Sequence, residues 1–169
     1  MKVKKFFLNQ FLKILQILPS NLSCFLNNLR MIYMNRKIHF SYYKEKDLFK
    51  VKENNYSIYF REKMRGINTY SYGIKARAIS LAETYNLELV NFVDGDTIID
   101  CGANFGDIYT WTKINNLKIN YISFEPSPSE FDCVQLNCKN QINNNLALSD
   151  ITGELFFFYK FFRRRFFCN

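Results

Sequence analysis

The sequence is poor in the residues on which several kinds of functional site depend. It contains one histidine, His39, and its five cysteines are scattered without a C-x-x-C pair. A histidine-rich metal site, a zinc ribbon and a disulfide framework are therefore not indicated, and we expect no metal. Scattered cysteines are typical of a reducing compartment, so we expect a cytoplasmic location.

Long apolar runs are missing too, and no uncharged apolar stretch is long enough to predict a membrane-spanning helix. The first 18 residues, MKVKKFFLNQFLKILQIL, have the basic front of a signal peptide, but polar residues interrupt them and no small-residue cleavage site follows. Instead, apolar residues recur at helical spacing: Phe7, Phe11, Ile14, Leu15 and Leu18. Two interpretations of this cationic helix stay open, packing on the domain or peripheral contact with an anionic membrane.

Acidic residues are scarce in the N-terminal third. Residues 1–50 contain 10 basic and 2 acidic residues, whereas residues 51–169 contain 13 of each. A uniformly basic nucleic-acid-binding protein would not show this division, so we expect no nucleic-acid partner. With 169 residues, of which 48% are hydrophobic, the chain is long enough for one domain of ordinary size with a buried core.

The first half of the chain gives few clear secondary-structure signals. Two β-rich runs, Leu48–Lys52 and Tyr56–Phe60, flank Asn54-Asn55 and predict a hairpin. Apolar spacing predicts a helix over residues 74–91, with Gly73 as its N-cap. Residues 21–45 receive no assignment.

Strands and helices alternate in the second half. Ser127, Pro128 and Glu130 form the S-x-x-E capping box of a helix with proline at its first position. The expected elements are a strand at 97–101, a helix at about 106–115, a strand at 117–124, the helix from Pro128, a strand at 145–149 and a further strand at 154–159. This order predicts an α/β fold with parallel strands joined by right-handed crossovers.

The segment D-C-G-A-N-F-G, residues 100–106, is the strongest candidate for a ligand-binding loop. Gly102 and Gly106 allow a ligand to approach the backbone, while Asp100 and, after the next strand, Glu125 supply carboxylates that suit an ammonium group and ribose hydroxyls. The dinucleotide G-x-G-x-x-G and the P-loop G-K-[ST] are absent, and Asp100 would repel a pyrophosphate. These features favour S-adenosylmethionine, although a tight turn that needs glycine for structural reasons alone is the alternative.

Three segments in order resemble the FkbM-type S-adenosylmethionine-dependent methyltransferases: GDTIIDCGANFGD, YISFEPSPSEFDCVQLNCKN and LALSDITGELFF. The resemblance covers roughly residues 73–159 and implies a Rossmann-like methyltransferase fold with S-adenosylmethionine as cofactor. It implies that Asp100, Gly102, Asn104 and Gly106 line the methionine moiety, with Ala103 also in the cofactor site, that Glu125 binds the ribose, and that residues 147–150 lie near the adenine. It also implies O-methylation of a hydroxyl on a saccharide or small metabolite.

The family's fourth-strand K-x-D-x-E-G motif does not occur here. We therefore expect only the N-terminal half of the parallel sheet in residues 73–159, after a basic helical segment and hairpin in residues 1–72 and before an atypical low-complexity tail in residues 160–169. The strand TIIDC would then be an exposed apolar edge. The alternative to a methyltransferase is a non-catalytic, truncated remnant with at most partial cofactor binding. No catalytic base is identified, since Tyr109, Asp107 and Asp150 qualify by chemistry only.

Overall fold

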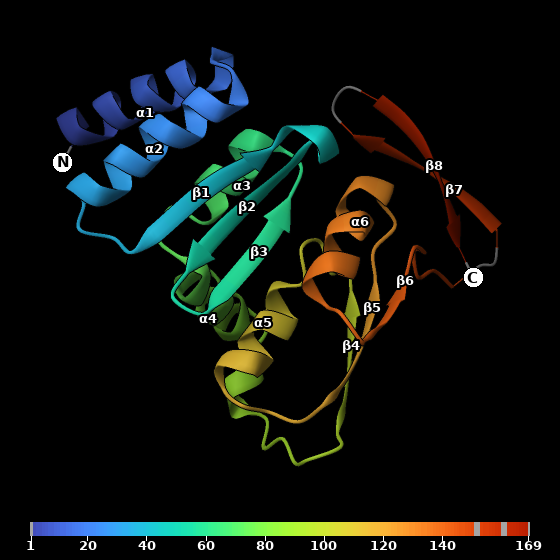
Figure 1. Cartoon of the computed structure of the whole chain (residues 1–169). Helices are drawn as coiled ribbons and strands as arrows, with labels where there is room; N and C mark the ends of the chain where they lie inside the picture. Colours follow the sequence, from blue (N-terminus) through green and yellow to red (C-terminus); the bar gives the residue numbers. More distant parts are fainter. Residues whose placement is uncertain (1, 151–152, 160–161, 169) are drawn as a thin grey trace. The chain divides into compact units, whose positions relative to one another are not determined.

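A computed structural model describes the backbone of residues 2–150, 153–159 and 162–168, and side chains from Phe7 to Asp150 (Figure 1). The chain divides into two compact units, Met1–Arg77 and Ala78–Asn169. The first unit contains sixteen Lys and Arg against four Asp and Glu, and the second contains seven against eleven. Within the described residues, no helix is both long enough and apolar enough to cross a membrane.

The first unit is a helical hairpin packed on a three-stranded antiparallel sheet. Helices α1 (Lys2–Ile17) and α2 (Ser20–Tyr33) precede strands β1 (Ile38–Tyr43), β2 (Leu48–Glu53) and β3 (Tyr56–Phe60) and helix α3 (Lys63–Thr69), with a 3-10 turn at Lys44–Lys46. The expected N-terminal helix and the β2–β3 hairpin are confirmed. In the hairpin, Glu53 pairs with Tyr56, and Asn54 takes a left-handed φ of 51° in the turn.

Helix α2 and strand β1 were not predicted because a polar side chain determines how they pack together. Asn28 of α2 forms a pair of hydrogen bonds with Phe40 of β1: its Nδ2 donates to the carbonyl and its Oδ1 accepts from the N–H, both at 2.8 Å. These bonds satisfy main-chain groups on the outer edge of β1, whose other edge pairs with β2. An asparagine in a run of mixed residues gives no periodic signal for such a contact.

The second unit is built on a parallel sheet. Helix α4 (Ile74–Thr84), whose first four residues belong to the first unit, and a 3-10 turn (Leu87–Leu89) lead to the other elements. These are β4 (Thr97–Cys101), α5 (Asp107–Ile114), β5 (Asn120–Phe124), α6 (Pro128–Asn137) and β6 (Ile142–Asn144). The strands pair in parallel in the order β4-β5-β6. Strands β7 (Gly153–Tyr159) and β8 (Phe162–Cys168) form a separate antiparallel pair. The predicted α/β class with parallel strands is confirmed.

Three predicted boundaries in this unit were wrong. The predicted 74–91 helix stops at Thr84, because Asn86 turns the chain with a left-handed φ of 53°. The second strand begins at Asn120 rather than at residue 117. The third strand lies at 142–144 and not at 145–149, because asparagine side chains fasten it to β5: the Ser123 hydroxyl donates to Asn143 Oδ1 at 2.7 Å.

Helix α6 begins as expected, with Ser127 as N-cap and Pro128 at its first position. The expected capping box is not formed in its usual way, because the Ser127 side chain makes no bond to a main-chain N–H of the helix. Its hydroxyl bonds to the Glu130 carboxylate instead.

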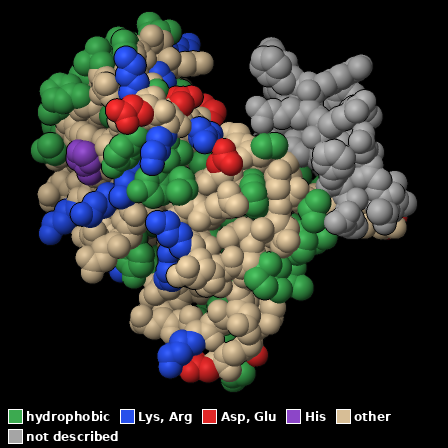
Figure 2. All heavy atoms as spheres, turned by 45° about the vertical axis from the view of Figure 1, so that its right-hand side comes forward, with side chains coloured by type: hydrophobic (Ala, Val, Ile, Leu, Met, Phe, Trp, Pro, Cys, Tyr) green, Lys and Arg blue, Asp and Glu red, His purple; other side chains and the backbone are tan. Residues whose placement is uncertain are grey.

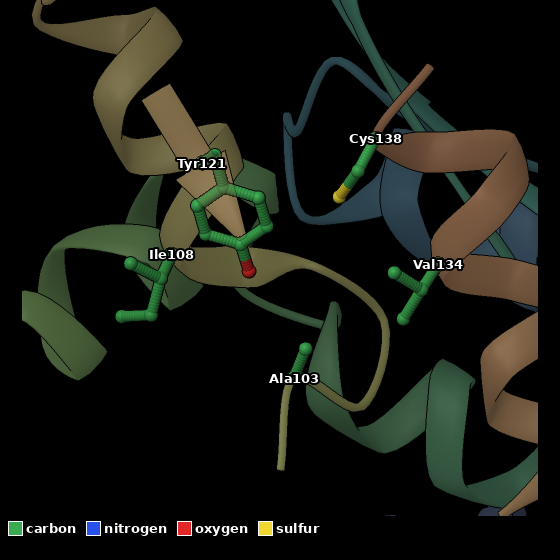
Figure 3. Close-up of a cluster of buried hydrophobic side chains, with 5 residues drawn as sticks. All are labelled: Ala103, Ile108, Tyr121, Val134 and Cys138. Carbon is green, nitrogen blue, oxygen red and sulfur yellow. The ribbon is translucent and has the colours of Figure 1, made fainter. Parts of the chain in front are cut away.

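The core of the second unit lies on one face of the parallel sheet. Tyr121 of β5 packs with Ala103, Ile108 of α5, and Val134 and Cys138 at α6 (Figure 3). On the opposite face, Ile99, Ile122 and Ile142 stand in register across the three strands, and Ile99 and Ile142 are 59% and 60% exposed. Among the described strands, β4 stands at the end of the order β4-β5-β6 and carries the exposed Ile99, so it is an exposed apolar edge, as expected.

Candidate functional site

Asp100 and Glu125 lie at the same edge of the parallel sheet. Cys101 and Phe124, the last residues of β4 and β5, pair directly in the parallel register. Asp100 therefore stands one residue before the end of β4 and Glu125 one residue after the end of β5. This edge, where the carboxyl ends of parallel strands meet, is where open α/β sheets bind their ligands.

The loop between β4 and α5 folds back over the end of β5. The N–H groups of Gly102 and Ala103 both donate to the Phe124 carbonyl, at 2.7 and 3.1 Å. Three of the five loop residues, Gly102, Asn104 and Gly106, have φ values of 88°, 53° and 78°. The loop therefore needs residues that tolerate the left-handed region, and glycine or asparagine occupies each of these positions.

The two glycines in this loop serve different purposes. A Cβ built on Gly102 would meet nothing within 4 Å, so the main chain there stays open to an approaching group. A Cβ on Gly106 would lie 2.3 Å from the Cys138 sulfur. Gly106 is therefore required for the loop to pack closely against the end of α6.

Glu125 fastens the loop to the start of α6. The residue is only 7% exposed. Its Oε2 accepts the Asn104 N–H at 2.7 Å, and its Oε1 accepts the Ser127 N–H at 2.9 Å. Nearby, Asn137 Nδ2 donates to the Phe105 carbonyl at 2.9 Å. The sequence predicted Glu125 as a ribose ligand. Its hydrogen bonds to Asn104 and Ser127 were not predicted, since neither follows from residue spacing.

Asp100 is a half-buried carboxyl group with one strong partner, the Tyr121 hydroxyl, which donates to its Oδ2. Burial raises the pKa of Asp100, the Tyr121 hydrogen bond opposes this increase, and the negative charge of Asp107 adds to it. Burial and the Asp100 charge together raise the pKa of Tyr121, which keeps that hydroxyl protonated as a donor.

An open cavity of about 370 Å³ lies beside β4. Asp100, Cys101, Ile99 and Tyr85 are among its lining residues, so of the predicted site residues it is Asp100 that faces this space. Its volume falls within the range of small-molecule sites. Glu125, held by its two main-chain bonds, is not one of the residues that line it.

Two further predicted site residues differ in what they offer. The Ala103 side chain is 4% exposed and belongs to the hydrophobic core, so only its main chain is available to a ligand. Asn104 Oδ1 is buried and has no hydrogen-bond donor among the residues that the structure describes. An acceptor left unpaired in this way costs free energy that a donor on a bound ligand would recover.

The side chains that qualify as a base by chemistry alone are placed as follows. The Tyr109 hydroxyl accepts from Gln141 Nε2 at 3.3 Å, and burial raises its pKa. Asp107 is buried at the first turn of α5, and Asp150 is exposed with the Ser149 hydroxyl on its Oδ1. Burial raises the pKa of the Cys138 thiol to about 12, so this cysteine is a packing residue and not a nucleophile.

In the part of the chain described here, no three His, Cys, Asp or Glu side chains gather closely enough to hold a metal ion. Comparison of the chain with protein-family models, curated proteins and solved structures gave no match.

Proposed function

We propose that this protein binds S-adenosylmethionine at the carboxyl edge of β4 and β5, as an FkbM-type methyltransferase that acts on a hydroxyl group of a saccharide or small metabolite. The main support for the proposal is the position of Asp100. Its carboxylate lies near the carboxyl end of a parallel strand, directly before a glycine-containing loop, and Asp100 lines an open cavity. The sequence resemblance supplies the cofactor and the reaction class.

The residues present fit the cofactor at three points. The Asp100 carboxylate is suited to accept hydrogen bonds from an ammonium group. The open space at Gly102 allows close approach to the main chain, and Asn104 Oδ1 has an unused acceptor position. When bound, the cofactor would supply an activated methyl group on a sulfonium. The Tyr121 hydroxyl would hold Asp100 in place through its hydrogen bond.

Glu125 fits less simply. Both of its oxygens accept main-chain N–H groups, and the residue is 7% exposed. Each oxygen can accept a further hydrogen bond, but the residue is buried, so a ribose contact requires the loop at Asn104 or the chain at Ser127 to move aside. Glu125 would then couple cofactor binding to the position of the loop.

Cofactor binding without methyl transfer is the second candidate function, and the exposure of β4 favours it. Ile99 borders the cavity and is 59% exposed, so water reaches this side of the site. Transfer of a methyl group to a hydroxyl requires that nucleophile and sulfonium be held in line, and it benefits when competing water is excluded.

Calorimetric titration of the full chain with S-adenosylmethionine tests the proposal. We expect Asp100→Asn to weaken binding by about 1–3 kcal/mol, or roughly 5- to 150-fold, because a charge-assisted hydrogen bond is lost while the side-chain shape is kept. The matched control is Asp94→Asn. Asp94 lies in the turn that precedes the start of β4, its side chain is 73% exposed, and the variant should bind the cofactor as tightly as the parent chain. Equal affinities of the two variants for the cofactor, or no binding by the parent chain, would contradict the proposal that Asp100 belongs to an S-adenosylmethionine site.

Formation of S-adenosylhomocysteine from bound cofactor separates the two candidate functions. With saccharide hydroxyl acceptors present, a methyltransferase releases this product in proportion to methylated acceptor. A chain that binds the cofactor and never forms the product has the second function.

A further inference from the structure

The helical hairpin of the first unit presents few residues to the interior. In α1, Leu15 is fully buried, and in α2 the buried residues are Ser23, Cys24, Asn27 and Met31. The Ser23 hydroxyl lies 2.8 Å from the Leu15 carbonyl and 3.1 Å from the Pro19 carbonyl, which holds the two helices together at their turn. Many of the other described side chains of the two helices, among them Ile17 and Ile32, are exposed to solvent.

These solvent-facing sides are apolar rather than polar. The exposed residues include Ile17 at 83%, Ile32 at 72%, Phe7 at 66% and Phe25 at 57%. On α2 the exposed apolar residues recur at three- and four-residue steps, at Leu22, Phe25, Leu29 and Ile32. Hydrophobic side chains are visible over the upper left of Figure 2, where these helices lie. A stripe of this kind on a surface helix normally faces a core, and an uncovered one marks an interaction site.

The charged residues of this segment itself are all of one sign. Residues 1–37 contain seven Lys and Arg and no Asp or Glu. Lys13 and Lys37 are exposed, and the Arg30 guanidinium lies 5.9 Å from the Phe11 ring centre, joining α2 to α1. An apolar stripe on a segment whose charged residues are all cations is complementary to an anionic lipid surface, which supplies hydrocarbon and phosphate at one interface.

A second copy of the chain fits this surface less well. Two copies meeting through it would bring fourteen cations together with no acid from these segments, because each contributes the same seven. Neither helix is both long enough and apolar enough to span a bilayer.

We propose that the outward faces of α1 and α2 dock the protein on the surface of an anionic phospholipid bilayer. Ile17, Phe25 and Ile32 enter the outer hydrocarbon region, and Lys13 and Lys37 contact lipid phosphates.

Flotation of the full chain with vesicles in a density gradient tests this, because aggregated protein does not float. The chain should float with phosphatidylcholine vesicles containing about 30% phosphatidylserine, should not float with pure phosphatidylcholine, and should be released as salt rises from about 0.1 to about 0.5 M. The double variant Ile17→Ser/Ile32→Ser should bind about tenfold less, since two buried aliphatic side chains are lost. Lys13→Glu should bind about fivefold less.

Matched controls use residues of the second unit with similar exposure. Leu89→Ser replaces a side chain that is 78% exposed, and Lys118→Glu replaces one that is 81% exposed; both should float like the parent chain. Circular dichroism confirms that each variant is folded. The proposal is overturned if the parent chain does not float with anionic vesicles, or if the double variant floats as well as Leu89→Ser. It is also overturned if sedimentation without lipid shows a dimer that the double variant abolishes, because the occupant is then a second copy.

Discussion

Replacing Gly106 by alanine tests the packing that shapes the glycine loop. The new methyl group would start 2.3 Å from the Cys138 sulfur, and Gly106 has a φ of 78°. The left-handed backbone costs about 1 kcal/mol for alanine, and overpacking a buried contact adds about 1–3 kcal/mol. We therefore expect the free energy of unfolding of the second unit to fall by roughly 2–4 kcal/mol.

Gly95→Ala is the matched control, since Gly95 has a φ of 94° but a Cβ there would meet nothing within 4 Å. It should carry the backbone cost alone, about 1 kcal/mol. Adding Cys138→Ala to Gly106→Ala removes the sulfur in the way, so the double variant should recover about 1–3 kcal/mol relative to additivity.

The assay is urea unfolding followed by tryptophan fluorescence. Trp111 is the only tryptophan in the chain, lies on α5 and is 7% exposed, so its emission reports on the second unit. If Gly106→Ala costs no more than Gly95→Ala, or if the Cys138 substitution shows no coupling, then the loop does not pack on α6 as described.

Three other predictions use different properties of the chain. The pKa of Asp100 is raised in the folded state, so the folded protein retains a proton that the unfolded chain loses. Stability therefore falls as pH rises from the unfolded pKa of 3.8 through the folded pKa. In unfolding monitored by Trp111 fluorescence from pH 3 to about pH 7, Asp100→Asn should lack this part of the decline, and identical pH profiles of variant and parent would contradict the prediction. Ile99→Lys on the exposed edge of β4 should reduce concentration-dependent light scattering and leave the unfolding midpoint unchanged; unchanged scattering would show that this edge does not drive association. Glu62, the N-cap of α3, accepts two main-chain N–H groups, so Glu62→Ala should cost about 0.5–2 kcal/mol in unfolding of the first unit followed by circular dichroism, and a cost near zero would argue against the cap.

The parts of the fold that were predicted correctly are those governed by short-range periodicity and turn chemistry. The strand TIIDC, the helix after Gly106 and the start of α6 at Pro128 follow from apolar runs, glycine and proline. The missed elements depend on asparagine side chains that bond to distant main chain. Asn28 fixes α2 on β1, and Asn144 Nδ2 donates to the Ser123 carbonyl at 3.1 Å, which helps place β6 earlier than predicted.

The candidate site also has parts that could be predicted from the sequence and parts that could not. Asp100 could be placed from sequence because it lies near the carboxyl end of an apolar strand, and parallel pairing then brings it to the same edge as Glu125. The hydrogen bonds of Glu125 to Asn104 and Ser127 could not be predicted, since they depend on how the loop folds back over β5. The cavity beside Asp100 also needed the structure, because Tyr85 reaches it from the segment after α4.

Amide chemical shifts of the labelled full chain, recorded while S-adenosylmethionine is added, test the central claim most directly. We expect saturable shifts centred on Gly102, Asn104 and Gly106. The Ser127 amide should also shift, because its N–H and that of Asn104 share the Glu125 carboxylate. Absence of shifts at millimolar cofactor, or shifts confined to α1 and α2, would contradict the claim that this edge of the sheet binds the cofactor.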